Sequence, residues 1–135
     1  MRKQRGFTYL GVLIVIAILG IGLSAASEVW VTQARRQKIE ELDWVGQQYV
    51  QAIRGYYESS PGQVKAYPRT LQDLLEDRRF VTMRRHLRQV YVNPLTGKTD
   101  WELVVTPDGG VKGVAIRCRL GDGVFTIERM FVYAP

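Results

Sequence analysis

Residues 2–20 run RKQRGFTYLGVLIVIAILG, and no charged side chain follows Arg5 until Glu28. A run of about 20 apolar residues, at about 1.5 Å rise per residue, matches a bilayer hydrocarbon core about 30 Å thick. The stretch therefore predicts one membrane-spanning helix over residues 7–27. Because Arg2, Lys3 and Arg5 precede it, the positive-inside tendency predicts a cytoplasmic N-terminus and an exported C-terminal part.

Two places in this stretch are candidates for proteolytic processing. Ser24-Ala25-Ala26 offers the small residues at which a signal peptidase cuts after an apolar region. The Gly6–Phe7 junction instead lies before the apolar region, directly after the basic leader. The N-terminus of the mature protein distinguishes the two sites.

The string from Lys3 to Leu10, with the apolar residues 12–19 that follow it, resembles the leader and N-terminal helix of type IV pilins and type II secretion pseudopilins. The resemblance implies that prepilin peptidase cuts after Gly6 and methylates the new N-terminal amine of Phe7. It also implies a bacterial inner-membrane location before assembly, with the N-terminus in the cytoplasm and the C-terminal domain in the periplasm.

One position departs from the family pattern. Gly11 stands at the fifth position after the cut, where the family usually has glutamate. A carboxylate there would neutralise a neighbouring subunit's buried ammonium, because an unpaired charge is costly in a low dielectric. By resemblance, absence of this glutamate points to a minor, tip-located subunit rather than the major repeating one. It leaves the prediction of processing unchanged.

Composition sets the size of the exported part and limits its partners. The 135 residues suit one modest domain once the apolar stretch is set aside. The formal net charge is +6, three of these charges come from the leader, and the others are mixed with acidic residues, as in EDRR at 76–79. This mixing is typical of a solvated surface and argues against a nucleic-acid partner.

Residues 28–57 change from continuously apolar to amphipathic. Apolar residues recur at intervals of three and four over the later part, the period of a helix packed on one side: Trp30, Ala34, Leu42, Val45, Tyr49, Ala52 or Ile53, and Tyr56. No proline occurs in residues 7–60, so both parts predict one helix of about 50 residues, or about 75 Å. It should end near Pro61-Gly62.

The C-terminal half predicts a short helix followed by strands. Thr70 with Asp73 forms a capping pattern before Leu71, Leu74 and Leu75, for a helix ending near Arg78 or Arg79. Strands are expected over 101–105, 111–118 and 124–132, separated by turns at 107–110 and 121–123. The fold class is therefore α+β: a pilin-like fold whose long N-terminal helix, half transmembrane and half amphipathic, packs on a three- or four-stranded antiparallel sheet.

Catalytic and metal-binding patterns are missing from the sequence. Cys118 is the single cysteine, so the chain has no internal disulfide, and a lone thiol in a strand pattern is typical of a small buried apolar side chain. His86 has no cysteine or second histidine at metal spacing. We therefore expect no enzyme, no cofactor and no metal site.

The loop at 93–97, NPLTG, resembles a proline-containing loop of major-pseudopilin-like proteins, which often hold calcium between strands. The acidic loop residues here are Asp100, Asp108 and Asp122, whereas calcium takes six to eight oxygens. We expect turn-forming aspartates instead.

These patterns predict a structural subunit of a type II secretion pseudopilus or type IV pilus. Its parts are a leader (1–6), a transmembrane and filament-core helix (7–27) and a periplasmic domain (28–135). The implied partners are other pilin or pseudopilin subunits, prepilin peptidase, an inner-membrane assembly platform with its ATPase, and membrane lipid before assembly.

Two alternatives stay open. One is a DNA-uptake or adhesive minor pilin that binds its ligand through a basic surface on the exported domain: Arg78, Arg79, Arg84, Arg85 and Arg88. Salt-dependent DNA binding would be its signature. The other is a single-pass membrane protein that is never processed.

Overall fold

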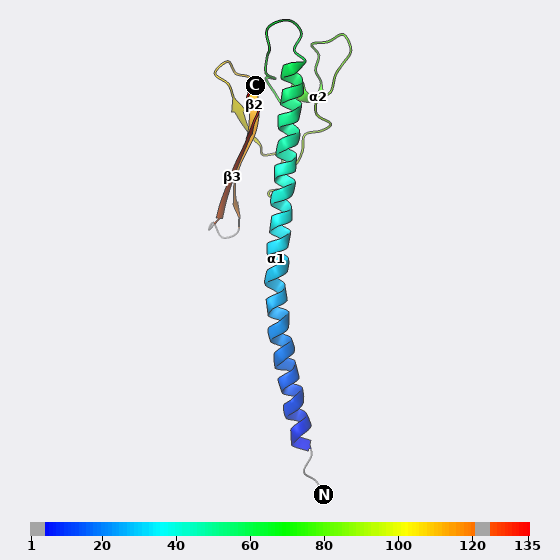
Figure 1. Cartoon of the computed structure of the whole chain (residues 1–135), viewed down its shortest axis with the longest axis vertical. Helices are drawn as coiled ribbons and strands as arrows, with labels where there is room; N and C mark the ends of the chain where they lie inside the picture. The colour runs from blue at the N-terminus through cyan, green and yellow to red at the C-terminus, as the bar shows by residue number, and fades with distance from the viewer. Residues whose placement is uncertain (1–4, 121–124) are drawn as a thin grey trace. The chain divides into compact units, whose positions relative to one another are not determined.

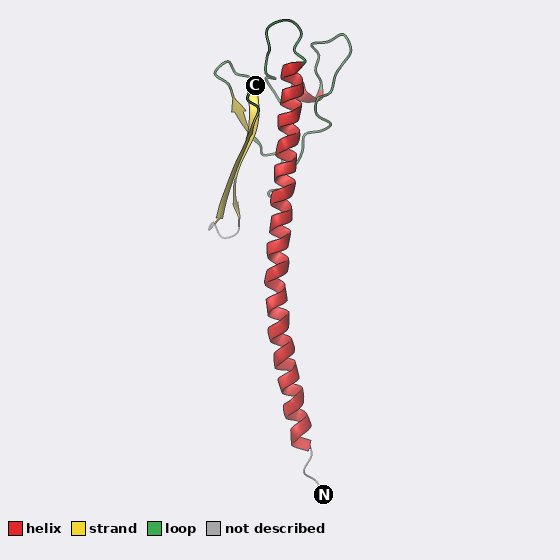
Figure 2. Ribbon diagram, in the orientation of Figure 1, coloured by secondary structure: helices red, strands yellow, loops and turns green. Residues whose placement is uncertain are grey.

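The computed structural model describes the backbone of residues 5–120 and 125–135; within these ranges the side chains of 5–7, 22–29, 31, 120 and 125 are not described. Helix α1 (Arg5–Glu58) and helix α2 (Gln72–Leu75) precede three strands, β1 (Glu102–Val105), β2 (Val111–Leu120) and β3 (Phe125–Val132) (Figure 1). The residues fall into two compact units, Met1–Gln37 and Lys38–Pro135, which we describe separately. Figure 2 shows that helix α1 accounts for most of the helical residues.

Helix α1 is a single helix of 54 residues, which confirms the prediction of one long helix that ends before Pro61-Gly62. In the N-terminal unit the apolar side chains described between Tyr9 and Ile21 are exposed on every side of the helix. Ten large ones between Tyr9 and Ile21 are 45–72% exposed. A helix that is apolar all round is typical of one covered by lipid or by other protein.

The packed stripe of helix α1 is shorter than the sequence predicts. Trp30 and Ala34 are exposed, and the buried residues begin at Leu42. Within the described ranges, no helix provides a stretch both long and apolar enough to cross a bilayer. The membrane span predicted over residues 7–27 therefore stays a prediction.

The second unit contains a three-stranded antiparallel sheet in the order β1-β2-β3, as predicted. Val114 in the central strand lies opposite Leu103 of β1 and opposite Phe131 of β3. The turn between β1 and β2 is closed by Gly109, whose positive φ of 80° favours glycine and whose N–H donates to the Thr106 carbonyl over 2.9 Å. The turn predicted around Asp122 lies outside the described residues.

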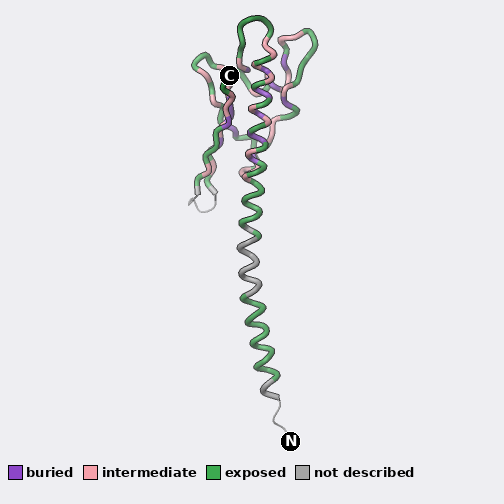
Figure 3. The backbone as a smooth tube through the Cα atoms, viewed as in Figure 1, coloured by how far each residue is buried: buried purple, intermediate pink, exposed green. Residues whose placement is uncertain are grey.

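Residues 38–58 of helix α1 cover this sheet with Leu42, Val45, Tyr49 and Ile53, all buried as predicted. Figure 3 shows buried residues on this part of the helix and on the strands of the same unit. At Gly46 the helix packs directly against Phe131 of β3, since an added Cβ would lie 2.5 Å from the Phe131 ring. Glycine is therefore required here by packing against the sheet.

Helix α2 (Gln72–Leu75) follows the Thr70–Asp73 pattern, but Leu71 and not Thr70 occupies its N-cap position, and it ends at Leu75 and not near Arg78 or Arg79. The Asp73 carboxylate accepts from the Thr70 N–H over 3.0 Å, and the Thr70 hydroxyl accepts from the Asp73 N–H over 3.3 Å. The chain leaves the helix because Asp77 pairs with Arg84 as an isolated antiparallel bridge. Tertiary pairing thus shortens the helix.

Candidate functional site

The predicted processing site lies at the start of helix α1. The backbone of Gly6 and Phe7 is helical, whereas their side chains and residues 1–4 are outside the described part of the chain. Cleavage after Gly6 and methylation of Phe7 stay predictions. A Cβ added at Gly11 would have no described heavy atom within 4 Å, apart from its chain neighbours and the nearby backbone of its own helix. Packing within the chain therefore does not require glycine at the position where the family usually has glutamate.

Beyond this segment, the strongest polar cluster surrounds the buried carboxylate of Asp77. Arg79 donates to it twice through its side chain, from Nε to Oδ1 over 2.9 Å and from Nη2 to Oδ2 over 2.7 Å. His86 Nε2 lies 3.0 Å from Oδ2, and because a carboxylate only accepts, this nitrogen carries the hydrogen. The Arg79 hydrogen bond is the main cause that lowers the pKa of Asp77 far below its usual value.

The same arginine caps the C-terminal end of helix α1. Arg79 Nη2 donates to the Tyr56 carbonyl over 2.9 Å, and the guanidinium carbon lies 3.4 Å from the centroid of the Tyr56 ring. Lys65 Nζ donates to the Glu58 carbonyl over 2.8 Å. Helix α1 has no basic residue in its last turn. The positive charges that stabilise the C-terminal carbonyls and the negative end of the helix dipole therefore come from Arg79 and Lys65, which lie later in the chain.

The five arginines that the sequence suggested as one ligand-binding surface have different surroundings in the structure. Arg79 belongs to the Asp77 network and Arg78 pairs with Glu76 over 2.9 Å, so neither is free for an anionic ligand. Arg84 lies over the Phe80 ring, 4.3 Å from its centroid. Arg85 and Arg88 are exposed and line a separate groove. The five arginines therefore have different partners and surroundings, and Arg79 alone is part of a buried network.

His86, the second partner of Asp77, is largely buried. Its side chain is only 12% exposed, and its ring packs edge-on against Tyr56 of helix α1 with centroids 5.6 Å apart. The sequence interval between Asp77 and His86 carries no recognised motif. Only the bridge that brings Asp77 beside Arg84 places this ring next to the carboxylate.

An aromatic cluster joins helix α1 to the loop before β1. The Tyr49 hydroxyl accepts from the Tyr91 N–H over 2.9 Å and donates to the Tyr91 carbonyl over 3.2 Å. Trp101 Nε1 donates to the same carbonyl over 2.8 Å. Burial raises the pKa of Tyr49 to about 12 because the phenolate would lose its hydration.

The loop at 93–97 is held by its own side chains. Asn93, fully buried, donates from Nδ2 to Asp100 Oδ1 over 3.0 Å, and Thr96 donates to the same oxygen over 2.8 Å. The Asn93 hydrogen bond lowers the pKa of Asp100. Asp100 thus stabilises the turn. Among the described residues, no group of three or more histidine, cysteine, aspartate or glutamate side chains could hold a metal ion.

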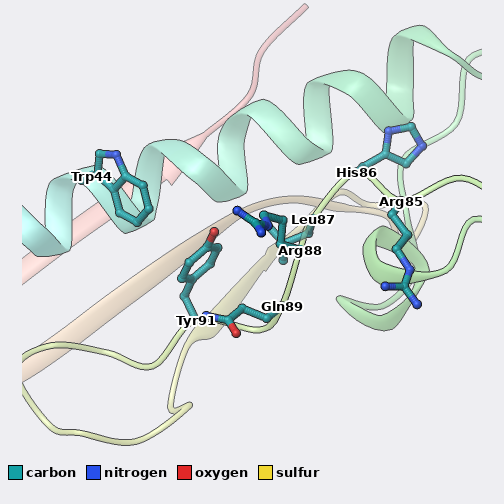
Figure 4. A pocket seen from close by; sticks show the side chains of 7 residues that line it. All are labelled: Trp44, Arg85, His86, Leu87, Arg88, Gln89 and Tyr91. Atoms are coloured by element: carbon teal, nitrogen blue, oxygen red, sulfur yellow. The ribbon is translucent and has the colours of Figure 1, made fainter.

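A groove of about 800 Å³ runs beside helix α1, lined by Trp44, Arg85, His86, Leu87, Arg88, Gln89 and Tyr91 (Figure 4). Sequence reasoning missed Trp44 and Tyr91. Trp44 lies two residues after buried Leu42, which is about 200° around the helix. Its position away from the apolar stripe could therefore have predicted that its side chain is exposed. Tyr91 carried no signal of its own.

Comparison with known proteins bears on the N-terminal segment. Residues 1–27 match the family model described as the prokaryotic N-terminal methylation motif, which covers 27 of the 135 residues. No curated protein and no solved structure matches the chain. The motif indicates a pilin-like substrate of prepilin peptidase, and proteins that carry it are structural rather than catalytic. Over residues 1–27 the chain therefore carries the prepilin-type signal of type IV pilins and pseudopilins.

Proposed function

We propose that the protein is a structural subunit of a type II secretion pseudopilus or a type IV pilus. Prepilin peptidase cuts it after Gly6 and methylates the amine of Phe7. The observation that carries this proposal is the methylation motif at residues 1–27.

The exposed apolar surface of residues 8–21 supports the proposal. Ten large apolar side chains lie on all sides of this helical segment and are 45–72% exposed. Removing such a helix from lipid is tolerable only when other helices replace the lipid contacts. Membrane release and assembly would thus be coupled, with an assembly ATPase and an inner-membrane platform as partners.

The N-terminus of the mature protein tests the processing step. The protein, expressed from Met1 in a strain that produces prepilin peptidase and then isolated, should begin with methylated Phe7 in a peptide-mapping mass spectrum. Gly6→Val should accumulate uncut chain that begins at or near Met1, because the branched side chain crowds the scissile bond. Ala26→Val serves as the matched control and should still be cut before Phe7.

Two results would contradict the proposal. Wild-type protein that keeps Met1 would identify an unprocessed single-pass protein. Cleavage after Ala26, blocked by Ala26→Val and not by Gly6→Val, would identify an ordinary signal peptide.

A further inference from the structure

The groove beside helix α1 presents aromatic surface to solvent. Trp44 is 54% exposed although Val45, its neighbour in sequence, is buried. Its ring meets Tyr91 edge-to-face, with centroids 5.7 Å apart and planes at 86°. Exposed aromatic surface held in a fixed orientation is typical of contact sites, where its burial contributes much of the binding energy.

The cations of this groove have no partner in the described part of the chain. Five arginines elsewhere in the unit pair with carboxylates: Arg54 with Glu58, Arg78 with Glu76, Arg79 with Asp77, Arg117 with Glu128, and Arg129 with Asp43. Arg85 and Arg88 are exposed, and no ion pair within 4 Å is found for either among the described residues. The groove therefore has positive charge to offer a ligand.

The backbone that carries these arginines is held on both sides. The N–H groups of His86 and Leu87 donate to the Leu74 carbonyl over 2.9 and 3.0 Å, and Leu87 is buried. The Tyr91 N–H donates to the Tyr49 hydroxyl over 2.9 Å. Because the segment is already ordered, ligand binding loses less conformational entropy than binding to a free loop would.

We propose that this groove binds an acidic segment of a partner protein, in which a carboxylate side chain lies next to an aromatic or large aliphatic one. Arg88 receives the carboxylate through paired N–H···O bonds, for which the planar guanidinium is suited. The Trp44 and Tyr91 rings receive the apolar neighbour. A volume of about 800 Å³ accommodates a few side chains.

The charge of the unit favours a peptide over a nucleic acid. Residues 38–135 contain 14 lysines and arginines and 12 aspartates and glutamates, an excess of two positive charges. Nucleic-acid binding draws on a basic stripe that neutralises many phosphates. Arg88 beside the Trp44–Tyr91 pair, with Arg85 further along the groove, suits one or two carboxylates instead (Figure 4). The proposal does not depend on cleavage at Gly6.

Binding to a defined acidic probe tests this inference. The full-length protein in detergent micelles is titrated into a fluorescein-labelled random copolymer of glutamate and tyrosine, and fluorescence anisotropy is measured. Saturable binding is expected, tighter than to polyglutamate of the same length. Arg88→Gln and Trp44→Ala should each weaken it about tenfold, the effect of losing a charge-assisted hydrogen bond or an aromatic contact.

Arg119→Gln is the matched control, because it removes the same charge from an exposed arginine of β2 outside the groove. It should leave the affinity unchanged. Arg88→Lys keeps the charge without the planar fork and should give an intermediate affinity. Near-ultraviolet circular dichroism of each variant checks that the aromatic core is intact.

Four results would overturn the proposal. They are no binding of the copolymer, an equal loss in Arg119→Gln, tighter Arg88-dependent binding of a labelled oligothymidine, and sedimentation that shows Arg88-dependent self-association in place of copolymer binding. The last two would assign the groove to a nucleic acid or to a second copy of the chain.

Discussion

Asp77 and Glu76 are neighbouring carboxylates with opposite environments. Asp77 is buried and bound by Arg79 and His86, whereas the Glu76 carboxylate bridges to the exposed Arg78. A buried charge that loses its partner is costly, while an exposed pair is screened by water. Substituting each residue in turn therefore compares how much a buried and an exposed ion pair contribute to the free energy of unfolding.

We expect Asp77→Asn to lower the free energy of unfolding by about 3 kcal/mol or more, because Arg79 would be left without its counter-charge. Glu76→Gln should change it by less than about 1 kcal/mol. Urea unfolding of the full-length protein in detergent, followed by near-ultraviolet circular dichroism, measures both. Equal effects of the two substitutions would contradict the assignment of Asp77 as a central ionic contact.

The pH dependence of Asp77 has a defined sign. Because the pKa of this carboxyl is lowered in the folded state, its charge stabilises the fold above the ordinary value of 3.8. That contribution is lost as the pH falls below 3.8 toward the lowered pKa. The unfolding midpoints of wild type and Asp77→Asn should therefore differ by a constant amount above the ordinary value of 3.8 and begin to converge as the pH falls below it. Parallel curves would show that another group carries the acid sensitivity.

Tyr49 should produce the opposite dependence, at alkaline pH. Its pKa is raised from 10.0 to about 12, so the neutral hydroxyl stabilises the fold below pH 10 and that contribution is lost as the pH rises toward 12. Tyr49→Phe should cost about 1–3 kcal/mol at neutral pH, because the Tyr91 N–H loses its acceptor. The variant should also lose stability less steeply above pH 10. An unchanged alkaline slope would contradict this role.

At the scale of the element, helix α1 has two kinds of glycine. A Cβ added at Gly20 would have no described heavy atom within 4 Å, apart from its chain neighbours and the nearby backbone of its own helix. A Cβ added at Gly46 would clash with the Phe131 ring. Alanine normally stabilises a helix interior by about 1 kcal/mol relative to glycine. Overpacking a core contact typically costs about 1–3 kcal/mol, so the packing effect should exceed the propensity effect at Gly46.

Gly46→Ala is therefore expected to lower the stability of the C-terminal unit by about 1 kcal/mol or more. Phe131→Leu removes the clashing ring, and the double variant should recover part of the loss, which a double-mutant cycle would show as favourable coupling. Gln47→Ala, at the adjacent exposed position, is the control and should stay within about 0.5 kcal/mol of wild type. Additive effects of Gly46→Ala and Phe131→Leu would contradict the observed contact.

At the scale of the whole molecule, Gly11 bears on the place of the subunit in a filament. A Cβ added at Gly11 meets nothing within 4 Å outside its own stretch of helix, so the first atom of a longer side chain has room there. If the proposed function holds, Gly11→Glu should raise the number of copies per filament, because the carboxylate neutralises a neighbouring subunit's amine. Gly11→Gln has the same size without the charge and should not. Quantitative immunoblots of sheared filaments measure both, and equal incorporation of the two variants would contradict the idea.

The local sequence determines the elements of this protein. The absence of proline from residues 7–60 gives one helix, Pro61-Gly62 follows its end, and alternating apolar residues give three strands at the predicted places. The basic leader and Gly6–Phe7 junction predict the prepilin-type signal that residues 1–27 match. Each of these depends on neighbours in the chain, through helix periodicity, strand alternation or a short motif.

Tertiary structure alone determines which distant side chains meet. Arg79 reaches the Tyr56 carbonyl 23 residues earlier, Gly46 meets the Phe131 ring, and Trp44 meets Tyr91 in a groove that Arg85 and Arg88 also line. No pattern along the chain encodes these pairs, because charge type and apolarity are shared by many residues and only packing selects among them. That is why the five arginines appeared as one surface in sequence, and why folding separates a structural arginine from those that line the groove.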